Sequence, residues 1–245
     1  MDVEFGVPQG SVLGPNLFAL FINDMPNIIE GEEDAEIEVF ADDTTIYVVG
    51  PTVDIVTSRL NEILCKFWDW CINNSLSPHP GKTEFMLMKG KSFIGPVRAT
   101  KLGTYVIKQV QSTRCLGMEL DDEMKWSKHV LNTIKSFSQK INLLKSLYFL
   151  PKKARIDFYN KVILPSITYG IILWGSCNKS LFNDLEKMHV RAAKIIFCLN
   201  WNTPTNDVIT ICNWKTLRRT YLESLAKLTQ KSYYQVVPTA IADLF

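Results

Sequence analysis

The sequence lacks the patterns that tie a chain to zinc, to disulfides or to a membrane. Its six cysteines form no CxxC pair, and none has a following histidine at zinc-finger spacing, which argues against a zinc site. Most lie among apolar residues, so we expect small buried thiols in a reducing compartment and no disulfide. The first residues do not resemble a secretory signal, and no apolar run reaches the roughly 20 residues that cross a bilayer. These absences predict an intracellular protein with no membrane partner, without distinguishing nucleus from cytoplasm.

The sequence does have enough apolar content for a folded core, and its charge is unevenly distributed. Of the 245 residues, 47% are hydrophobic and 21% are charged, as in globular proteins. Residues 1–124 carry 9 Lys and Arg against 19 Asp and Glu, whereas residues 125–245 carry 18 against 6. The formal charges of −10 and +12 suggest an acidic or metal-binding part joined to a part that binds a polyanion. Lys-rich helices that serve solubility alone are the other interpretation.

The first part of the chain predicts a short helix and a hairpin. Gly14 and Pro15 suit a helix start, and the apolar face that follows ends before Pro26. Two runs of β-branched or aromatic residues, 37–40 and 45–49, flank the tetrapeptide Ala-Asp-Asp-Thr. The pattern is therefore typical of a β-hairpin with carboxylates at its turn.

A long helix and several short strands are predicted next. Residues 56–71 place apolar side chains at the spacing of an amphipathic helix, which stops before two prolines. A strand is expected at residues 84–88. Between residues 93 and 119, short strand-like pieces are separated by glycines. The front of the chain is thus α+β.

After Trp126 the pattern becomes helical throughout. Ser127 is suited to cap a helix whose apolar stripe runs over residues 130–144, and Pro151 is suited to start another. A third helix is expected from Ser180 and a fourth over residues 216–234. On the third, the cations fall at i, i+4 and i+7, which places them on one face: Lys187, Arg191 and Lys194.

Asp42 and Asp43 at the hairpin have two interpretations. Adjacent aspartates are common in ordinary turns because their side chains bond nearby backbone groups. A turn anchored by two apolar strands, however, holds both carboxylates rigidly, where hard oxygen ligands can bind a divalent ion.

Residues 6–15 (GVPQGSVLGP) followed by residues 40–43 (FADD) resemble consecutive palm motifs of non-LTR retrotransposon reverse transcriptases, which are RNA-directed DNA polymerases. The resemblance covers nearly all of the chain and includes further motifs at 75–78 (SLSP), 81–83 (GKT), 115–118 (CLGM) and 125–129 (KWSKH). Residues 164–170 and 185–193 are similar to the thumb and post-thumb region of those proteins. The resemblance implies a partial palm at 1–124, with an antiparallel sheet of two to four strands backed by helices. An all-α thumb at 125–200 and a helical C-terminal extension at 201–245 would follow it.

In that family the palm catalyses attack of a DNA primer 3′-hydroxyl on the α-phosphate of a deoxynucleoside triphosphate opposite an RNA template, using two Mg²⁺ ions. The resemblance makes Asp42 a catalytic metal ligand, Asp43 a weaker second ligand, and Lys82 a neighbour of the departing pyrophosphate. It assigns nucleotide and template binding to Pro8, Gln9, Gly10, Ser11, Phe40 and Ala41. Leu116 and Gly117 correspond to the primer grip. The basic face formed by Lys187, Arg191 and Lys194 is expected to bind nucleic acid.

Two departures from the family pattern affect these expectations. Phe40 replaces the family's tyrosine, which keeps the ring and loses the hydroxyl. Family members also place a first metal-binding aspartate tens of residues before Gly6, and this sequence has five residues there. Neither Asp2 nor Asp24 is a convincing substitute. Because two Mg²⁺ ions repel strongly unless several anionic ligands share them, we expect the chain to be inactive alone.

The front of the chain is also expected to expose a strand edge and apolar surface, and hence to be marginally soluble. Two alternatives to a polymerase fragment are kept. One is a non-catalytic module that binds RNA or an RNA–DNA duplex, and the other is a fossil reading frame without a selected function.

Overall fold

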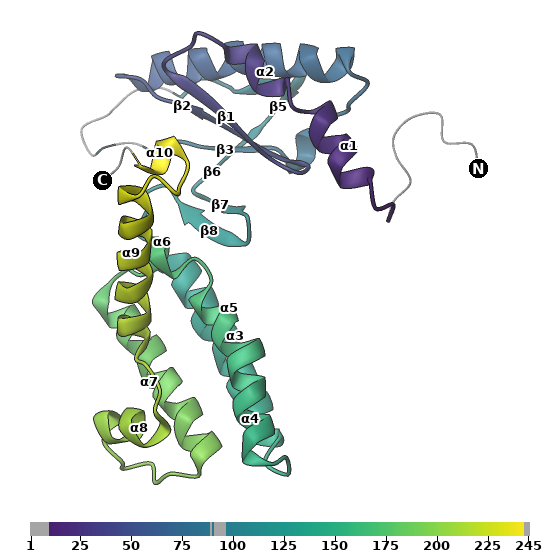
Figure 1. Ribbon diagram of the computed structural model, residues 1–245. Helices are drawn as coiled ribbons and strands as arrows, with labels where there is room; N and C mark the ends of the chain where they lie inside the picture. The colour runs from purple at the N-terminus through teal and green to yellow at the C-terminus, as the bar shows by residue number, and fades with distance from the viewer. Residues whose placement is uncertain (1–9, 89, 91–96, 243–245) are drawn as a thin grey trace. The chain divides into compact units, whose positions relative to one another are not determined.

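The structure is a computed structural model that describes residues 10–88, 90 and 97–242 (Figure 1). The chain divides into two compact units, one ending at Gln111 and the other beginning at Ser112. Both helices and short β-ladders are present, which confirms the α+β class predicted from the sequence. No helix in the described part of the chain is long and apolar enough to span a membrane.

The first unit is built around one long helix and four short β-ladder elements. Its helical elements are α1 (Gly14–Phe21), the 3-10 helix η1 (Met25–Ile29), α2 (Val53–Asn73) and the 3-10 helix η2 (Pro80–Lys82). Its strands are β1 (Ala35–Phe40), β2 (Asp43–Val48), β3 (Glu84–Met86), β4 (Lys101–Leu102), β5 (Tyr105–Val106) and β6 (Lys108–Val110). The predicted helix starting at Gly14, the hairpin and the long amphipathic helix are thereby confirmed. The strand predicted at 84–88 is shorter than expected.

Helix α2 provides the surface on which the β1–β2 hairpin and the β4–β5 segment pack. Thr52 caps its start, since the Thr52 hydroxyl accepts a hydrogen bond from the Ile55 N–H at 3.3 Å. On α2, Ile63 is fully buried against the hairpin, and Leu64 is buried against Leu102. Figure 1 shows α2 running along the hairpin. The apolar stripe seen in the sequence is therefore what holds the hairpin in place.

An ion-pair cluster ties the acidic loop before β1 to the same helix. The Arg59 guanidinium pairs with Glu32, with Asp34 and, at 2.7 Å, with Glu62. Lys66 pairs with Glu32 at 2.9 Å. Hydrogen bonding to Lys66 and the charge of Arg59 lower the pKa of Glu32. Much of the negative charge of this loop is thus offset locally.

The strands of the described residues form four separate two-stranded pairs. The pairs β1–β2, β4–β5 and β7–β8 are antiparallel, and β3 pairs with β6 in parallel. The ladder that carries Asp43 has two strands, which lies within the predicted range, but a purely antiparallel arrangement was wrong. A parallel pair needs a long crossover, and here the segment between β3 and β6, which includes the β4–β5 hairpin, provides it.

The second unit opens with the hairpin β7 (Ser112–Cys115) and β8 (Met118–Asp121) and continues as helices. They are α3 (Ser127–Ser146), α4 (Lys152–Phe158), the π-helix η3 (Tyr159–Ile163), α5 (Leu164–Thr168), α6 (Ile171–Trp174), α7 (Lys179–Phe197), α8 (Thr205–Cys212), α9 (Leu217–Tyr233) and α10 (Thr239–Ala242). Helices α3 and α7 pack along one another. Fully buried Phe137, Leu144 and Leu185 lie in this core. The predicted stripe on α3 is confirmed, with Ile134 only partly buried.

The predicted cap of α3 was wrong. Ser127 is the first helical residue, its hydroxyl makes no capping bond, and the N-cap is Trp126 with φ +63°. Asp121 supplies the acceptor instead: its carboxylate accepts hydrogen bonds from the N–H groups of Lys125 at 2.9 Å and Trp126 at 2.7 Å. The turn before α3 is therefore held by a side chain at the end of β8.

The start of α9 is held in a similar way from another helix. Thr216 caps it through the Arg219 N–H at 3.1 Å, and the Glu186 carboxylate on α7 accepts from the N–H groups of Leu217 and Arg218 at 3.2 Å each. Burial raises the pKa of Glu186, partly opposed by these two hydrogen bonds. The anion at the helix start also suits the helix dipole.

Candidate functional site

The carboxylate pair lies at the tip of the β1–β2 hairpin. Phe40 pairs with Asp43, so Ala41 and Asp42 form a two-residue turn, and Ala41 has φ +52°. A positive φ at a turn residue matches the right-handed twist of the strands but strains any residue with a Cβ. The Asp42 and Asp43 side chains are exposed. The turn presents both carboxylates at one end of a fixed ladder, as the sequence predicted.

The two faces of this hairpin differ in character. Successive strand residues alternate between faces, so Ile37, Ile46 and Val48 share the face that packs on α2. The opposite face carries Glu36, Glu38, Phe40, Asp43 and Tyr47. Phe40 is 65% exposed, so its ring lies open next to the carboxylates. Asp43 therefore belongs to an acidic and aromatic open face.

These two carboxylates do not by themselves make a two-metal centre. Among the described residues, no group of three or more His, Cys, Asp or Glu side chains is placed to hold a metal ion. Mg²⁺ accepts carboxylate oxygens but needs near-octahedral coordination, and a pair of such ions needs bridging anions. The described residues thus offer part of a donor set.

The other expected polymerase residues of the first unit are only partly brought to this tip. Pro8 and Gln9 lie outside the described residues. Gly10 has φ +83°, and the Ser11 hydroxyl accepts a hydrogen bond from the Gly14 N–H at 3.0 Å, which supports the start of α1. Lys82 is exposed at the end of η2, and no hydrogen bond or ion pair within the described residues joins it to the hairpin.

Leu116 and Gly117 form the two-residue turn of the β7–β8 hairpin. Both have positive φ, +45° and +84°, as a type I′ turn requires, although Leu is an unusual residue there. The Tyr169 hydroxyl donates to the Leu116 carbonyl at 2.8 Å. Next to it, Gly170 has φ +62°, and a Cβ there would lie 2.3 Å from Met118 Sδ. The turn is therefore held against the segment between α5 and α6.

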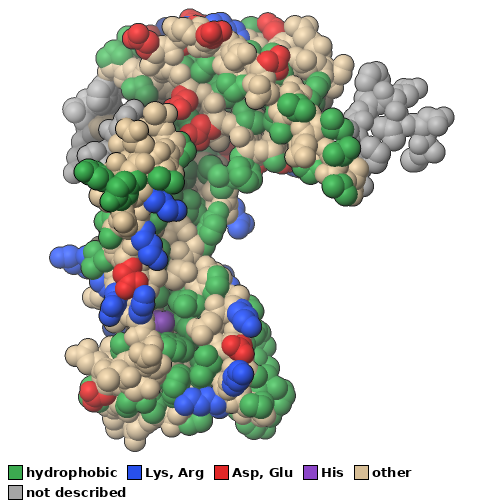
Figure 2. All heavy atoms as spheres, viewed as in Figure 1, with side chains coloured by type: hydrophobic (Ala, Val, Ile, Leu, Met, Phe, Trp, Pro, Cys, Tyr) green, Lys and Arg blue, Asp and Glu red, His purple; other side chains and the backbone are tan. Residues whose placement is uncertain are grey.

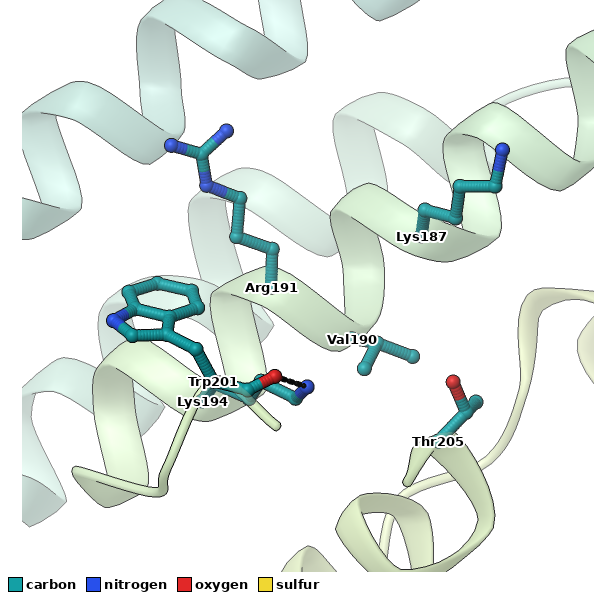
Figure 3. A pocket seen from close by; sticks show the side chains of 6 residues that line it. All are labelled: Lys187, Val190, Arg191, Lys194, Trp201 and Thr205. Carbon is teal, nitrogen blue, oxygen red and sulfur yellow. Dashed lines mark hydrogen bonds between the residues drawn. The ribbon is translucent and has the colours of Figure 1, made fainter. Parts of the chain in front are cut away.

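The three predicted cations of α7 line one pocket of about 350 Å³ in the second unit, shown in Figure 3. Val190, Trp201 and Thr205 complete its lining. The Lys187 ammonium pairs with Asp184 at 2.9 Å, and the Lys194 ammonium donates to the Trp201 carbonyl at 2.7 Å. Within the described part of the chain Arg191 makes no hydrogen bond or ion pair. On the face drawn in Figure 2, Lys and Arg side chains gather along the helices of this unit.

A buried polar cluster in the second unit was missed by the sequence analysis. His189 is 2% exposed on α7, and its Nδ1 lies 2.5 Å from the Tyr159 hydroxyl. Its Nε2 lies 2.9 Å from the Lys215 carbonyl. A carbonyl only accepts, so Nε2 carries the proton and Nδ1 accepts from Tyr159. Trp214 stacks on the Tyr159 ring at 4.4 Å between centroids. Burial lowers the pKa of His189 to about 4.

The cysteines have no catalytic partner in this arrangement. All six are free thiols, three of them buried. Burial raises the pKa of Cys71 to about 11, which keeps it a neutral apolar side chain.

A carboxylate-bearing hairpin and a cation-lined pocket on a helical unit are features of proteins that process nucleic acids with metal ions. Residues 2–120 match the model of the reverse transcriptase (RNA-dependent DNA polymerase) family. This part of the chain belongs to that family, and the whole chain is related to the RNA-directed DNA polymerases of non-LTR retrotransposons.

The relatives extend beyond the matched domain. The chain is 28% identical over 214 residues to the RNA-directed DNA polymerase from mobile element jockey of Drosophila melanogaster, covering 84% of this chain and 23% of that protein. It is 28% identical to the probable RNA-directed DNA polymerase from transposon BS of the same fly, covering 78% and 22%. A retrovirus-related Pol polyprotein from a type-1 retrotransposable element R1 of Nasonia vitripennis is also 28% identical, over 69% and 43%. The chain thus spans less than a quarter of the jockey and BS proteins. No solved structure matches it significantly.

Proposed function

We propose that this chain works as part of an RNA-directed DNA polymerase, holding template and primer and contributing Asp42 and Asp43 to a Mg²⁺ site. The β1–β2 hairpin carries the proposal, because it fixes both carboxylates at a two-residue turn inside the segment that matches the reverse transcriptase family. The first unit would be part of the palm, and the second the thumb with its C-terminal helices.

Each proposed role follows from the side chain and its position. Asp42 at the tip would be the stronger metal ligand and Asp43, on the open face, the weaker one. The exposed Phe40 ring would pack near the nascent base pair, with Ala41, Gly10, Ser11, Pro8 and Gln9 around it. Lys82 would neutralise the departing pyrophosphate. Mg²⁺ bound at a complete site would stabilise the charge on the attacking and leaving oxygens.

The first test is Mg²⁺-dependent primer extension on an RNA template by the 245-residue polypeptide, with binding to the same primer–template measured in parallel. We expect binding without extension, because the described residues supply two carboxylates where a two-metal centre needs more. An Asp42→Ala variant is expected to bind equally well. Extension that disappears in Asp42→Ala would show that another carboxylate completes the site. Absence of binding would contradict the proposal itself.

The basic pocket of α7 supports a second candidate, a module that binds RNA or an RNA–DNA duplex without catalysis. Reversing the pocket cations to Glu (K187E/R191E/K194E) is expected to weaken binding at least tenfold at about 0.1 M salt. It should also flatten the dependence of log Kd on log salt by up to about 0.9 per lost phosphate contact.

A matched control separates local contact from overall charge. Lys135, Lys145 and Lys179 are exposed on α3 and α7 and lie outside the pocket lining. Their reversal to Glu changes net charge equally and is expected to weaken binding much less. Equal losses in both triple variants would mean that the pocket has no special part in binding.

A further inference from the structure

Trp201 is the one tryptophan of the six that is exposed, with 59% of its surface open. The other five are buried or half-buried. Trp201 makes no ring stack or cation–π contact with any described residue. A large apolar ring left open in this way keeps a flat face free for a ligand.

The backbone around Trp201 is fixed in position. The Asn200 side-chain oxygen accepts a hydrogen bond from the Asn202 N–H at 2.9 Å, and the Asn200 carbonyl accepts from the Thr203 N–H at 3.1 Å. Lys194 then anchors the Trp201 carbonyl to α7 at 2.7 Å. The indole is thereby held at a turn next to α7, so little order has to be imposed when a ligand arrives.

The pocket beside the indole combines an apolar wall with cations. Val190 lies between Arg191 and Lys194 on the α7 side, and Thr205 closes the α8 side (Figure 3). Lys187 is neutralised in part by Asp184, whereas Arg191 has no partner in the described part of the chain. Figure 3 shows the Arg191 side chain and the Trp201 indole on the same side of the pocket. An unpaired guanidinium is suited to a phosphate oxygen pair.

We propose that this pocket takes one unpaired nucleotide of a single-stranded RNA or DNA, with the base stacked on the Trp201 indole and the phosphate at Arg191. The inference rests on the proposed nucleic-acid binding and narrows it to one strand form at one place. The pocket volume of about 350 Å³ lies in the range of roughly 300–1,000 Å³ that small ligands occupy.

Single strands are favoured over duplex for a physical reason. A base inside a duplex already stacks on both neighbours and has no face left for an indole, whereas an unpaired base can stack on a protein ring without losing pairing. Phosphate contacts alone would not discriminate, since both forms carry them. The aromatic residue is therefore what confers the preference for single strands.

The test compares Trp201→Ala with the wild-type chain for binding labelled oligouridine, oligothymidine and a blunt RNA duplex of similar charge. Stacking of one base predicts that Trp201→Ala weakens binding of the single strands about tenfold. Binding of the duplex should change less than about twofold, since its phosphate contacts are kept. Trp201→Phe keeps a ring and should recover most of the loss. The oligouridine and oligothymidine arms show whether the 2′-hydroxyl matters. Far-UV circular dichroism checks that each variant is folded.

Tyr148→Ala is the matched control, because Tyr148 is a 78% exposed aromatic residue of the same unit outside the pocket lining. It should leave all three affinities unchanged. Equal weakening of single strands and duplex by Trp201→Ala, or none, would overturn this inference and leave the proposed binding function standing. A wild-type chain that binds none of the three would overturn both.

Discussion

Lowering the pH from 7 to 4 is expected to reduce the free energy of unfolding by about 3 kcal/mol through His189 alone. Burial holds the pKa of His189 at about 4 in the folded chain, against about 6.5 for an exposed histidine. Between these values the unfolded chain binds the extra proton and the folded chain does not. The contribution is therefore fully present above pH 6.5 and is lost as the pH falls toward 4. Protonation would also replace the Nδ1 acceptor of the Tyr159 hydroxyl with a second donor.

Urea unfolding at several pH values between 4 and 7.5 measures this effect, with His189→Gln as the comparison. The variant should be less stable at pH 7 and should have a shallower profile. His129 also has a pKa lowered by burial and contributes in the same direction, so the difference between the two profiles isolates His189. Parallel profiles for the wild type and His189→Gln would show that this histidine does not titrate as its burial requires.

Gly175→Ala is expected to destabilise the chain by about 3 kcal/mol, at the upper end of overpacking effects. A Cβ on Gly175 would lie 2.2 Å from Tyr221 Cδ2 on α9 and 2.4 Å from the Ile171 carbonyl oxygen. That carbonyl accepts the Gly175 N–H at 2.8 Å, so it cannot retreat without breaking its own hydrogen bond. Separation of α6 from α9 is the remaining way to relieve the overlap.

The urea midpoint of Gly175→Ala is best compared with that of Gly31→Ala. Gly31 has φ +84° with nothing within 4 Å of an added Cβ, so its substitution costs only the backbone strain of about 1–2 kcal/mol. Gly175 has φ −65°, where Ala is unstrained, and its cost arises from packing alone. Equal midpoints for the two variants would rule out the close packing of α6 and α9.

The features that followed from the sequence are those that depend on local periodicity. The apolar stripe of α2, the β1–β2 hairpin around Asp42 and the cation spacing on α7 each arise within one element, and each was predicted. Family resemblance supplied the roles of residues whose local pattern is uninformative, such as Lys82. The function of each of these residues stays a proposal.

Other features depend on contacts between distant segments, which no local pattern records. The parallel pairing of β3 with β6 requires a crossover, and the Asp121 carboxylate reaches the turn before α3 from the end of a strand. His189 is a polar residue in an amphipathic helix, and only the Tyr159 and Lys215 partners explain its burial. Trp201 read as one more apolar residue until its turn placed it in the open.

The π-helix η3 (Tyr159–Ile163) determines where the second unit tolerates a change in length. Tyr159, Ile163, Ile167 and Ile171 are buried at intervals of four residues. In an α-helix each such step overshoots a full turn by about 40°, and a wider π-turn absorbs part of this drift. Deleting one residue from η3 would restore α-helical winding but rotate everything after it by about 100°. Ile167 would then leave the core. Insertions and deletions among related elements are therefore expected to avoid this turn and to accumulate in loops such as that between α7 and α8.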